Sequence, residues 1–137
     1  MKIGEIWTHQ KYQLSDGSYK PKHLVILGEC NQKYDLLYAR LTSRSNGLPS
    51  DPPCYHGNPR SGFYLGIPGN RLAQHTWVVF DDISYLDSRE VQYLQYTGLI
   101  VPNPIFCNLL RCIQQSEDIL GIQYSQIMDT IQEINCS

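Results

Sequence analysis

The pattern of hydrophobic and polar positions predicts a protein built mainly from β-strands. An unbroken apolar run at residues 24–27 indicates a strand over 22–27 that needs apolar cover on both faces. Alternating or apolar segments at 2–9, 63–67 and 76–80 indicate further strands, separated by turn-forming residues. Together these segments predict a fold whose core is a β-sheet.

Residues 35–42 show the clearest alternation between the two faces of a strand. The apolar side chains at odd-numbered positions share one face, because successive side chains of a strand point to opposite sides. Arg40 and Thr42 share the other face, and the strand runs into Ser43 and Arg44. We expect these polar side chains to gather at one strand end.

The strand over 22–27 is preceded by basic side chains, namely Lys20, Lys22 and His23. A cation beside hydroxyl groups on a rigid strand end can bind or polarise a phosphate. A histidine that titrates near neutral pH can also transfer protons. The alternative role for His23 is structural, with its ring hydrogen-bonded to the backbone at the start of the strand.

Helices are predicted only in the last third of the chain. The first covers 87–98, because Asp87 can cap its start and Gly98 its end. The second covers 105–114, and a third opens at residue 116 with apolar positions at helical spacing. The last helix packs on the protein's own sheet or on a second copy, or else it covers a groove or binds a partner protein. The predicted fold class is therefore mainly β with C-terminal helices.

A long segment at 45–64 is rich in Gly, Pro, Asn and Ser and is predicted to be an ordered loop. Its Tyr55, His56 and Arg60 could hold unstacked bases of a single-stranded nucleic acid. Alternatively, the aromatic side chains only fold the loop onto the body of the domain. Both interpretations fit the sequence.

The composition limits the possible classes of protein. With 137 residues and 42% hydrophobic content, one globular domain is expected. A net charge of -2 provides no bulk positive field for nucleic acid, so the basic groups must be concentrated locally, or they form an ordinary mixed surface. Several of them do precede residue 72: Lys20, Lys22, Arg40, Arg44, Arg60 and Arg71.

The cysteines and the hydropathy predict a cytoplasmic protein. The five cysteines are Cys30, Cys54, Cys107, Cys112 and Cys136. Their odd number and the lack of a signal peptide indicate a reducing compartment with buried, unpaired thiols. Their spacing relative to each other and to His56 lacks the paired pattern of a structural zinc site, so no metal and no other cofactor is expected. No apolar run approaches about 18 residues, so no membrane span is expected.

Four stretches in this order resemble the MazF/PemK toxin family, whose members are small SH3-like barrels that cleave single-stranded RNA. These stretches are GEIW at 4–7, KPKHLVIL at 20–27, ARLTSR at 39–44 and WVVFDDISYLD at 77–87. The resemblance covers residues 4–115. It implies a barrel of five to seven strands with a closing helix over 1–115, and a helical extension over 116–137 packed on the same domain.

The resemblance implies a metal-independent endoribonuclease, in which the 2'-hydroxyl attacks its own phosphodiester. The family's arginine and threonine positions are held here by Lys22 and Thr42, and His23, Arg40 and Ser43 are further catalytic candidates. The RNA-binding candidates are Lys20, Arg44, Tyr55, His56, Arg60 and Asp81. Lysine lacks the planar fork of donors that arginine has. A second arginine of the PemK branch is replaced by Val79, so a weakened, altered or absent activity stays open.

The resemblance also implies partners. The expected ones are single-stranded RNA, a cognate antitoxin protein and a second copy of the chain in a homodimer. Two alternatives stay open. One is a non-enzymatic, CcdB-like toxin that binds a protein, and the other is a nucleic-acid-binding barrel that does not cleave.

Overall fold

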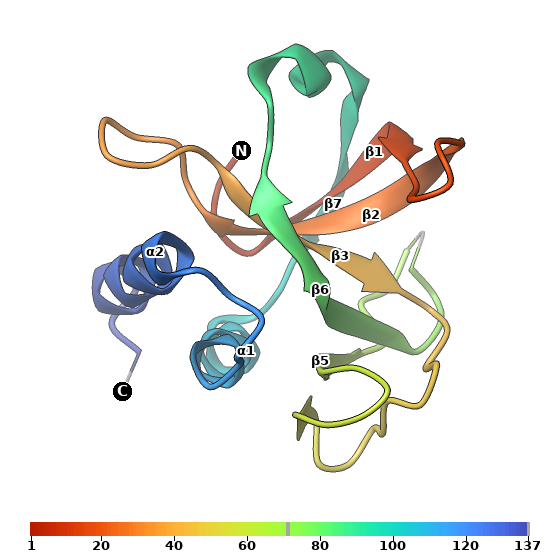
Figure 1. Ribbon diagram of the computed structural model, residues 1–137, viewed down its shortest axis with the longest axis vertical. Coiled ribbons are helices and arrows are strands. Elements are labelled where there is room, and N and C mark those ends of the chain that lie inside the picture. The colour runs from red at the N-terminus through yellow and green to blue at the C-terminus, as the bar shows by residue number, and fades with distance from the viewer. Residues whose placement is uncertain (71, 137) are drawn as a thin grey trace.

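The computed structural model of the protein describes residues 1–70 and 72–136, so Arg71 lies outside the described residues (Figure 1). In chain order, the elements are β1 (Glu5–Gln13), β2 (Tyr19–Gly28), β3 (Leu37–Thr42), β4 (Cys54–Tyr55), β5 (Gly62–Gly66), β6 (Thr76–Tyr85), the 3-10 helix η1 (Ser88–Tyr93), β7 (Leu94–Ile100), α1 (Asn103–Gln114) and α2 (Gly121–Glu133). The predicted class, mainly β with C-terminal helices, is confirmed.

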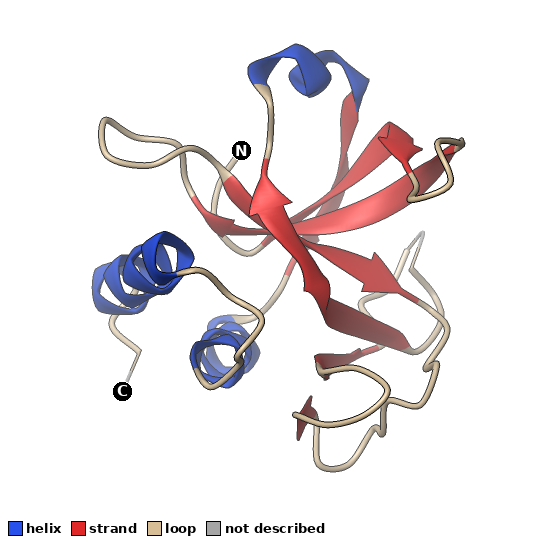
Figure 2. Ribbon diagram, viewed as in Figure 1, coloured by secondary structure: helices blue, strands red, loops and turns tan. Residues whose placement is uncertain are grey.

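The strands form one antiparallel sheet of seven strands in the order β4-β5-β6-β3-β2-β1-β7. The two outer strands, β4 and β7, do not pair with each other, so the sheet is open. The expected barrel of five to seven strands is therefore not closed in the described residues. The helices α1 and α2 lie on one side of the strongly twisted sheet, as the two blue helices at the lower left of Figure 2 show, whereas the third blue element, η1, lies beyond the end of β6.

The central strands match their predictions. Val25 and Leu27 of β2 are fully buried in the main core with the helices, whereas Leu24 and Ile26 are buried in a second cluster on the opposite face. The apolar cover on both faces that the unbroken run required is thus present. In β3, Tyr38 lies in the second cluster, as the alternation predicted.

The helix predicted over 87–98 is wrong beyond its first turn. Asp87 caps η1, and its carboxylate accepts a hydrogen bond from the Arg89 backbone N–H at 2.8 Å. The chain then continues as β7, which pairs with the exposed edge of β1. The Thr97 hydroxyl donates to the Ile6 carbonyl oxygen at 2.6 Å, at a register shift in this pair. Pairing with β1 satisfies the backbone here, and this long-range contact leaves no signal in the local sequence.

The last helix packs on the protein's own sheet, which is one of the alternatives left open. It begins at Gly121, later than predicted, and its buried side is largely polar. The side chains of Gln123, Gln126 and Thr130 donate to the backbone carbonyl oxygens of Ile83, Asp35 and Leu27, at 3.1, 2.8 and 3.1 Å. None of the described helices is both long and apolar enough to span a membrane.

Four of the five cysteines form disulfides, so the expectation of unpaired thiols is wrong for them. Cys54 is joined to Cys112, and Cys107 to Cys136. Cys30 is free and exposed. The first bridge ties β4 to α1 and the second ties α1 to the chain just after α2. Disulfides are typical of proteins in oxidising compartments.

Candidate functional site

A basic groove with a volume of about 610 Å³ lies at the end of the sheet where β2 begins and β3 ends. Eight of the eleven predicted site residues line it: Lys20, Lys22, His23, Arg40, Thr42, Ser43, Arg44 and Arg60. Among the described residues, no aspartate or glutamate lines the groove. The sequence prediction therefore located a surface with one sign of charge.

Lys22 and Thr42 lie on neighbouring strands and both line the groove. Leu24 and Arg40 form the last pair between β2 and β3 at this end, and Lys22 and Thr42 each lie two residues beyond that pair, on the same faces as Leu24 and Arg40. Directly opposed residues of neighbouring strands share a face of the sheet. An ammonium group and a hydroxyl therefore lie on the same face of neighbouring strands, as a phosphate site requires.

The same row continues across the sheet with aromatic side chains. Thr42 pairs with Trp77 of β6, and Trp77 pairs with Tyr64 of β5. The Tyr64 ring lies 5.3 Å from the Trp77 ring and 5.8 Å from the ring of His75, which is exposed. Sequence reasoning missed this aromatic cluster, because only the strand register places these side chains beside the groove.

The surroundings in the groove disfavour the positive charge of Lys22. The pKa of Lys22 is lowered first by partial burial of its amine, and further by the positive charges of Arg40, Lys20 and Arg44. No carboxylate contributes to the shift. A bound phosphate would supply the missing negative charge and favour the protonated amine.

Arg40 is held at the back of the groove by an acidic neighbour. Its Nη2 lies 3.3 Å from the Asp82 carboxylate, and only 18% of the Arg40 side chain is exposed. A bulge in β6 brings Asp82 there, because four residues of β6 lie opposite Ala39 between the paired positions Tyr38–Ser84 and Arg40–Val79. The ion pair makes Arg40 a weaker candidate for direct phosphate binding than Lys22.

Thr42 and His23 are both oriented by hydrogen bonds. The Thr42 hydroxyl oxygen accepts from the Arg44 backbone N–H at 3.1 Å, which shapes the turn at the strand end. His23 Nδ1 lies 3.0 Å from the hydroxyl of Thr8, its partner on β1. The first contact holds Thr42 at the end of β3, and the second fixes His23 on the face of β2 that it shares with Val25, opposite to Lys22.

Three predicted RNA-binding residues lie elsewhere. Tyr55 packs against the cluster around Trp77, and its hydroxyl donates to the Asn58 carbonyl oxygen at 3.3 Å, so it folds the loop onto the domain. His56 and Asp81 line a separate cavity of about 510 Å³. Arg60 borders both cavities.

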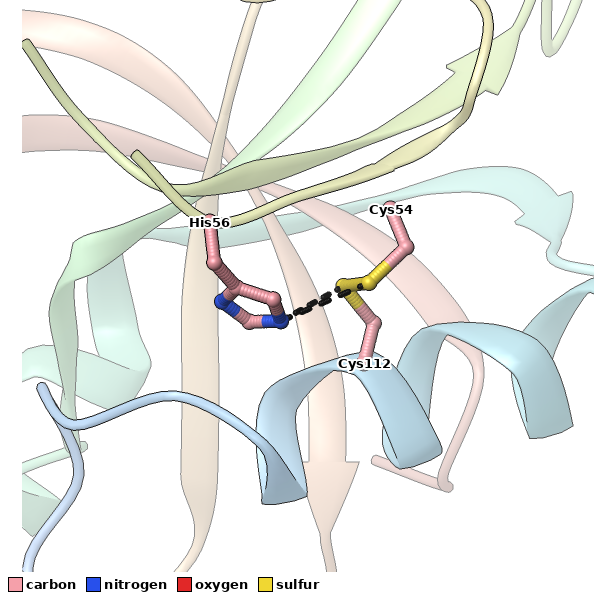
Figure 3. Close-up of side chains that lie close together, drawn as sticks. All are labelled: Cys54, His56 and Cys112. Atoms are coloured by element: carbon pink, nitrogen blue, oxygen red, sulfur yellow. Dashed lines mark hydrogen bonds between the residues drawn. A yellow bond between two sulfur atoms is a disulfide. The ribbon is translucent and has the colours of Figure 1, made fainter. Parts of the chain in front are cut away.

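A second group of side chains meets next to that separate cavity, and sequence reasoning missed it. Figure 3 shows the His56 ring pointing at the disulfide between Cys54 and Cys112. The two sulfurs and a ring nitrogen of His56 lie within 4.8 Å of one another. The pair Cys54-x-His56 was visible in the sequence, but Cys112 lies 58 residues away from Cys54.

Fold and site thus define an α+β protein with a cationic groove at one end of an open antiparallel sheet. No described aspartate or glutamate lines this groove. The chain matches no family model, no curated protein and no solved structure.

Proposed function

We propose that the protein binds single-stranded RNA in the basic groove and cleaves it without a metal ion. The observation that carries this proposal is that Lys22 and Thr42, on neighbouring strands, both line a groove that no described carboxylate lines. Such a groove attracts the phosphate backbone, and the adjacent Tyr64 and His75 rings offer surfaces on which bases can stack. The negative net charge of the whole chain does not oppose this, because the field that the RNA meets is local.

The proposed chemistry is an intramolecular transfer of the phosphodiester. The 2'-hydroxyl oxygen attacks the neighbouring phosphorus, the bond to the 5'-oxygen breaks, and a cyclic phosphate remains. The proton passes from the 2'-hydroxyl to the 5'-oxygen, with His23, which also lines the groove, as the candidate carrier, and the Lys22 ammonium balances the charge that develops on the phosphate oxygens. The hydroxyl proton of Thr42 is held only by a 3.5 Å contact to the Arg44 carbonyl oxygen, so it can turn toward a phosphate oxygen.

The resemblance to the MazF/PemK family supplies the biological part of the proposal. It comprises an SH3-like, MazF-type arrangement of the sheet, a role as the toxin of a bacterial toxin–antitoxin pair, inhibition by a cognate antitoxin, a homodimer and a cytoplasmic location. In a reducing cytoplasm, the two disulfides would be held as thiols.

The test is incubation of the purified protein with mixed-sequence single-stranded RNA in the presence of a metal chelator. We expect cleavage to leave cyclic phosphate ends. Lys22→Ala and Thr42→Ala should each abolish cleavage, and Lys22→Ala should weaken RNA binding about tenfold, as loss of one charge-assisted contact predicts. Lys33→Ala is the matched control, because Lys33 is an exposed lysine outside the groove, 3.6 Å from Asp129.

Two results would overturn the proposal in different ways. Binding that depends on Lys22 without any cleavage would leave a nucleic-acid-binding protein only. Equal cleavage by the native protein and the Lys22→Ala variant would place the activity outside this groove.

A protein-binding function of the CcdB-like class is the second candidate, and the outer face of α2 favours it. Leu120, at its N-cap, is 64% exposed, and Tyr124 and Met128 follow it at four-residue spacing on the same face and are also exposed. Apolar side chains grouped on one helix face can dock on a partner protein. If the protein neither binds nor cleaves RNA, this class of function is the one to pursue.

A further inference from the structure

We propose that the chemically reduced protein binds a zinc ion through Cys54, His56 and Cys112. Two thiolates and one imidazole form a donor set that Zn²⁺ prefers. The proposal is independent of the RNA groove, because none of these three residues lines that groove.

The distances from the histidine ring already fit a tetrahedral metal site. His56 Nε2 lies 3.4 Å from the Cys54 sulfur and 3.6 Å from the Cys112 sulfur. With Zn–S bonds of about 2.3 Å and a Zn–N bond of about 2.0–2.1 Å, the N···S edge of a tetrahedron measures about 3.5 Å. The imidazole nitrogen is therefore equidistant from both sulfurs at the separation that a shared zinc ion imposes (Figure 3).

Only the two sulfurs must move apart when the disulfide is reduced. The sulfurs of a tetrahedral zinc site lie about 3.8 Å from each other, which follows from the same bond length. Cys112 is fixed on α1 and is 2% exposed, whereas Cys54 is half-buried in the two-residue strand β4. A small shift of the β4 loop is enough to open the space between them.

The reaction balances in two steps. Two molecules of a small thiol reduce the Cys54–Cys112 disulfide, giving two cysteine thiols and one small-molecule disulfide. Zn²⁺ then replaces the two thiol protons, which are released to solvent. Three protein ligands leave the fourth position to water, and His56 borders the cavity of about 510 Å³ through which water can reach the metal.

The second disulfide provides a matched control within the same chain. Cys107 and Cys136 form a similar bridge between α1 and the segment after α2. Among the described residues, no histidine joins them in a group with metal-ligand geometry. If reduced cysteine pairs alone were sufficient, both pairs would bind zinc equally.

The experiment uses the full chain reduced with a phosphine, which does not itself supply thiol ligands. Cobalt(II) is added first, because thiolate-to-cobalt charge transfer reports sulfur ligands by absorption, and zinc is then titrated to displace it. All variants carry Cys30→Ser, which removes the exposed free thiol. We expect one metal ion per chain and release of two protons.

His56→Ala should weaken zinc binding by more than about 100-fold, since even the loss of an outer-shell partner costs about 10–100-fold. His56 is exposed, so this variant retains the fold and still forms the disulfide. Cys107→Ser with Cys136→Ser should leave zinc binding unchanged. The proposal is overturned if the reduced native protein binds zinc no more tightly than His56→Ala, or if the Cys107/Cys136 pair proves to be the ligand.

Discussion

Polar side chains have different surroundings at the two ends of the central strand pair β2–β3. At one end, α2 covers the sheet, and the buried side chains of Gln126 and Thr130 donate to backbone carbonyl oxygens. At the other end, the cations around Lys22 gather in a groove without a described carboxylate, and no helix residue lines that groove.

The polar residues at the two ends therefore contribute differently: those at the α2 end stabilise the fold, and those at the groove end are candidates for function. Each buried polar contact at the α2 end joins the helix to a backbone carbonyl group of the sheet or the loop next to it, so the sequence there serves the fold. Partial burial of the amine and, after it, repulsion from the neighbouring cations lower the pKa of Lys22, which is an electrostatic cost to the fold. Groups that cost stability and lie in a concave surface are candidates for function.

The largest expected effect is at the covered end. Ile127 of α2 is fully buried in the main core. Ile127→Ala should lower the free energy of unfolding by about 2–5 kcal/mol, because it removes buried methyl groups and leaves a cavity. Chemical denaturation measures the loss. Ile122→Ala is the control, since Ile122 lies on the same helix but is 54% exposed and should change stability by less than about 0.5 kcal/mol.

RNA binding by Ile127→Ala, measured where the variant is still folded, should equal that of the native protein. A loss of binding in the folded variant would show that the two ends are coupled and that the separation of roles is wrong.

A smaller effect is expected where β2 meets α2. A Cβ atom on Gly28 would lie 2.6 Å from the Gln126 side-chain nitrogen, so Gly28→Ala must displace that side chain. The displaced amide loses its 2.8 Å hydrogen bond to the Asp35 carbonyl oxygen. We expect Gly28→Ala to cost about 1–3 kcal/mol of unfolding free energy.

A double-mutant cycle sharpens this prediction. In a Gln126→Ala background the steric conflict is absent, so Gly28→Ala should cost at least about 1 kcal/mol less than in the native protein. Strictly additive effects in denaturant unfolding would show that Gln126 does not fix α2 against the end of β2.

The contrast between the two ends also explains what the sequence could predict. Period-two alternation and an unbroken apolar run identified β2 and β3, and with them most of the groove, because strand periodicity fixes which side chains share a face. The aromatic residues beside Thr42 and the partner of Cys54 depend on long-range pairings that local patterns do not record.

Local sequence patterns gave wrong predictions where tertiary contacts determined the structure. The cap at Asp87 and the glycine at 98 were consistent with a single helix, yet residues 94–100 form β7 because the edge of β1 was available for pairing. In the last helical segment, the expected apolar positions Ile119, Ile127, Ile131 and Ile134 pack in or against the main core, whereas Leu120 and Met128 are exposed. Glutamine and threonine are buried beside these apolar residues, because the end of the sheet presents carbonyl groups to which they can donate.

The smallest expected effect on stability is at the groove end. The test is whether a substitution there raises or lowers the unfolding midpoint. Burial and neighbouring cations lower the pKa of Lys22 in the folded protein below its usual value of 10.5, so folding disfavours the charged amine. Lys22→Met should therefore raise the unfolding midpoint at neutral pH while it weakens RNA binding. Because the native protein gains stability as pH rises through the lowered pKa toward 10.5, the advantage of the variant should shrink over that range.

A substitution at Lys33 is expected to shift the unfolding midpoint in the opposite direction. Its pKa is raised, first by a hydrogen bond with Tyr34 and further by the charge of Asp129, so its charged form is favoured by folding. Lys33→Met should lower the unfolding midpoint at neutral pH, and the difference should fade as pH rises through the raised pKa. Added salt should reduce both differences, because it screens charges near the surface. If Lys22→Met lowers the midpoint as Lys33→Met does, the groove carries no electrostatic cost, and the argument that its cations serve a bound phosphate loses its physical basis.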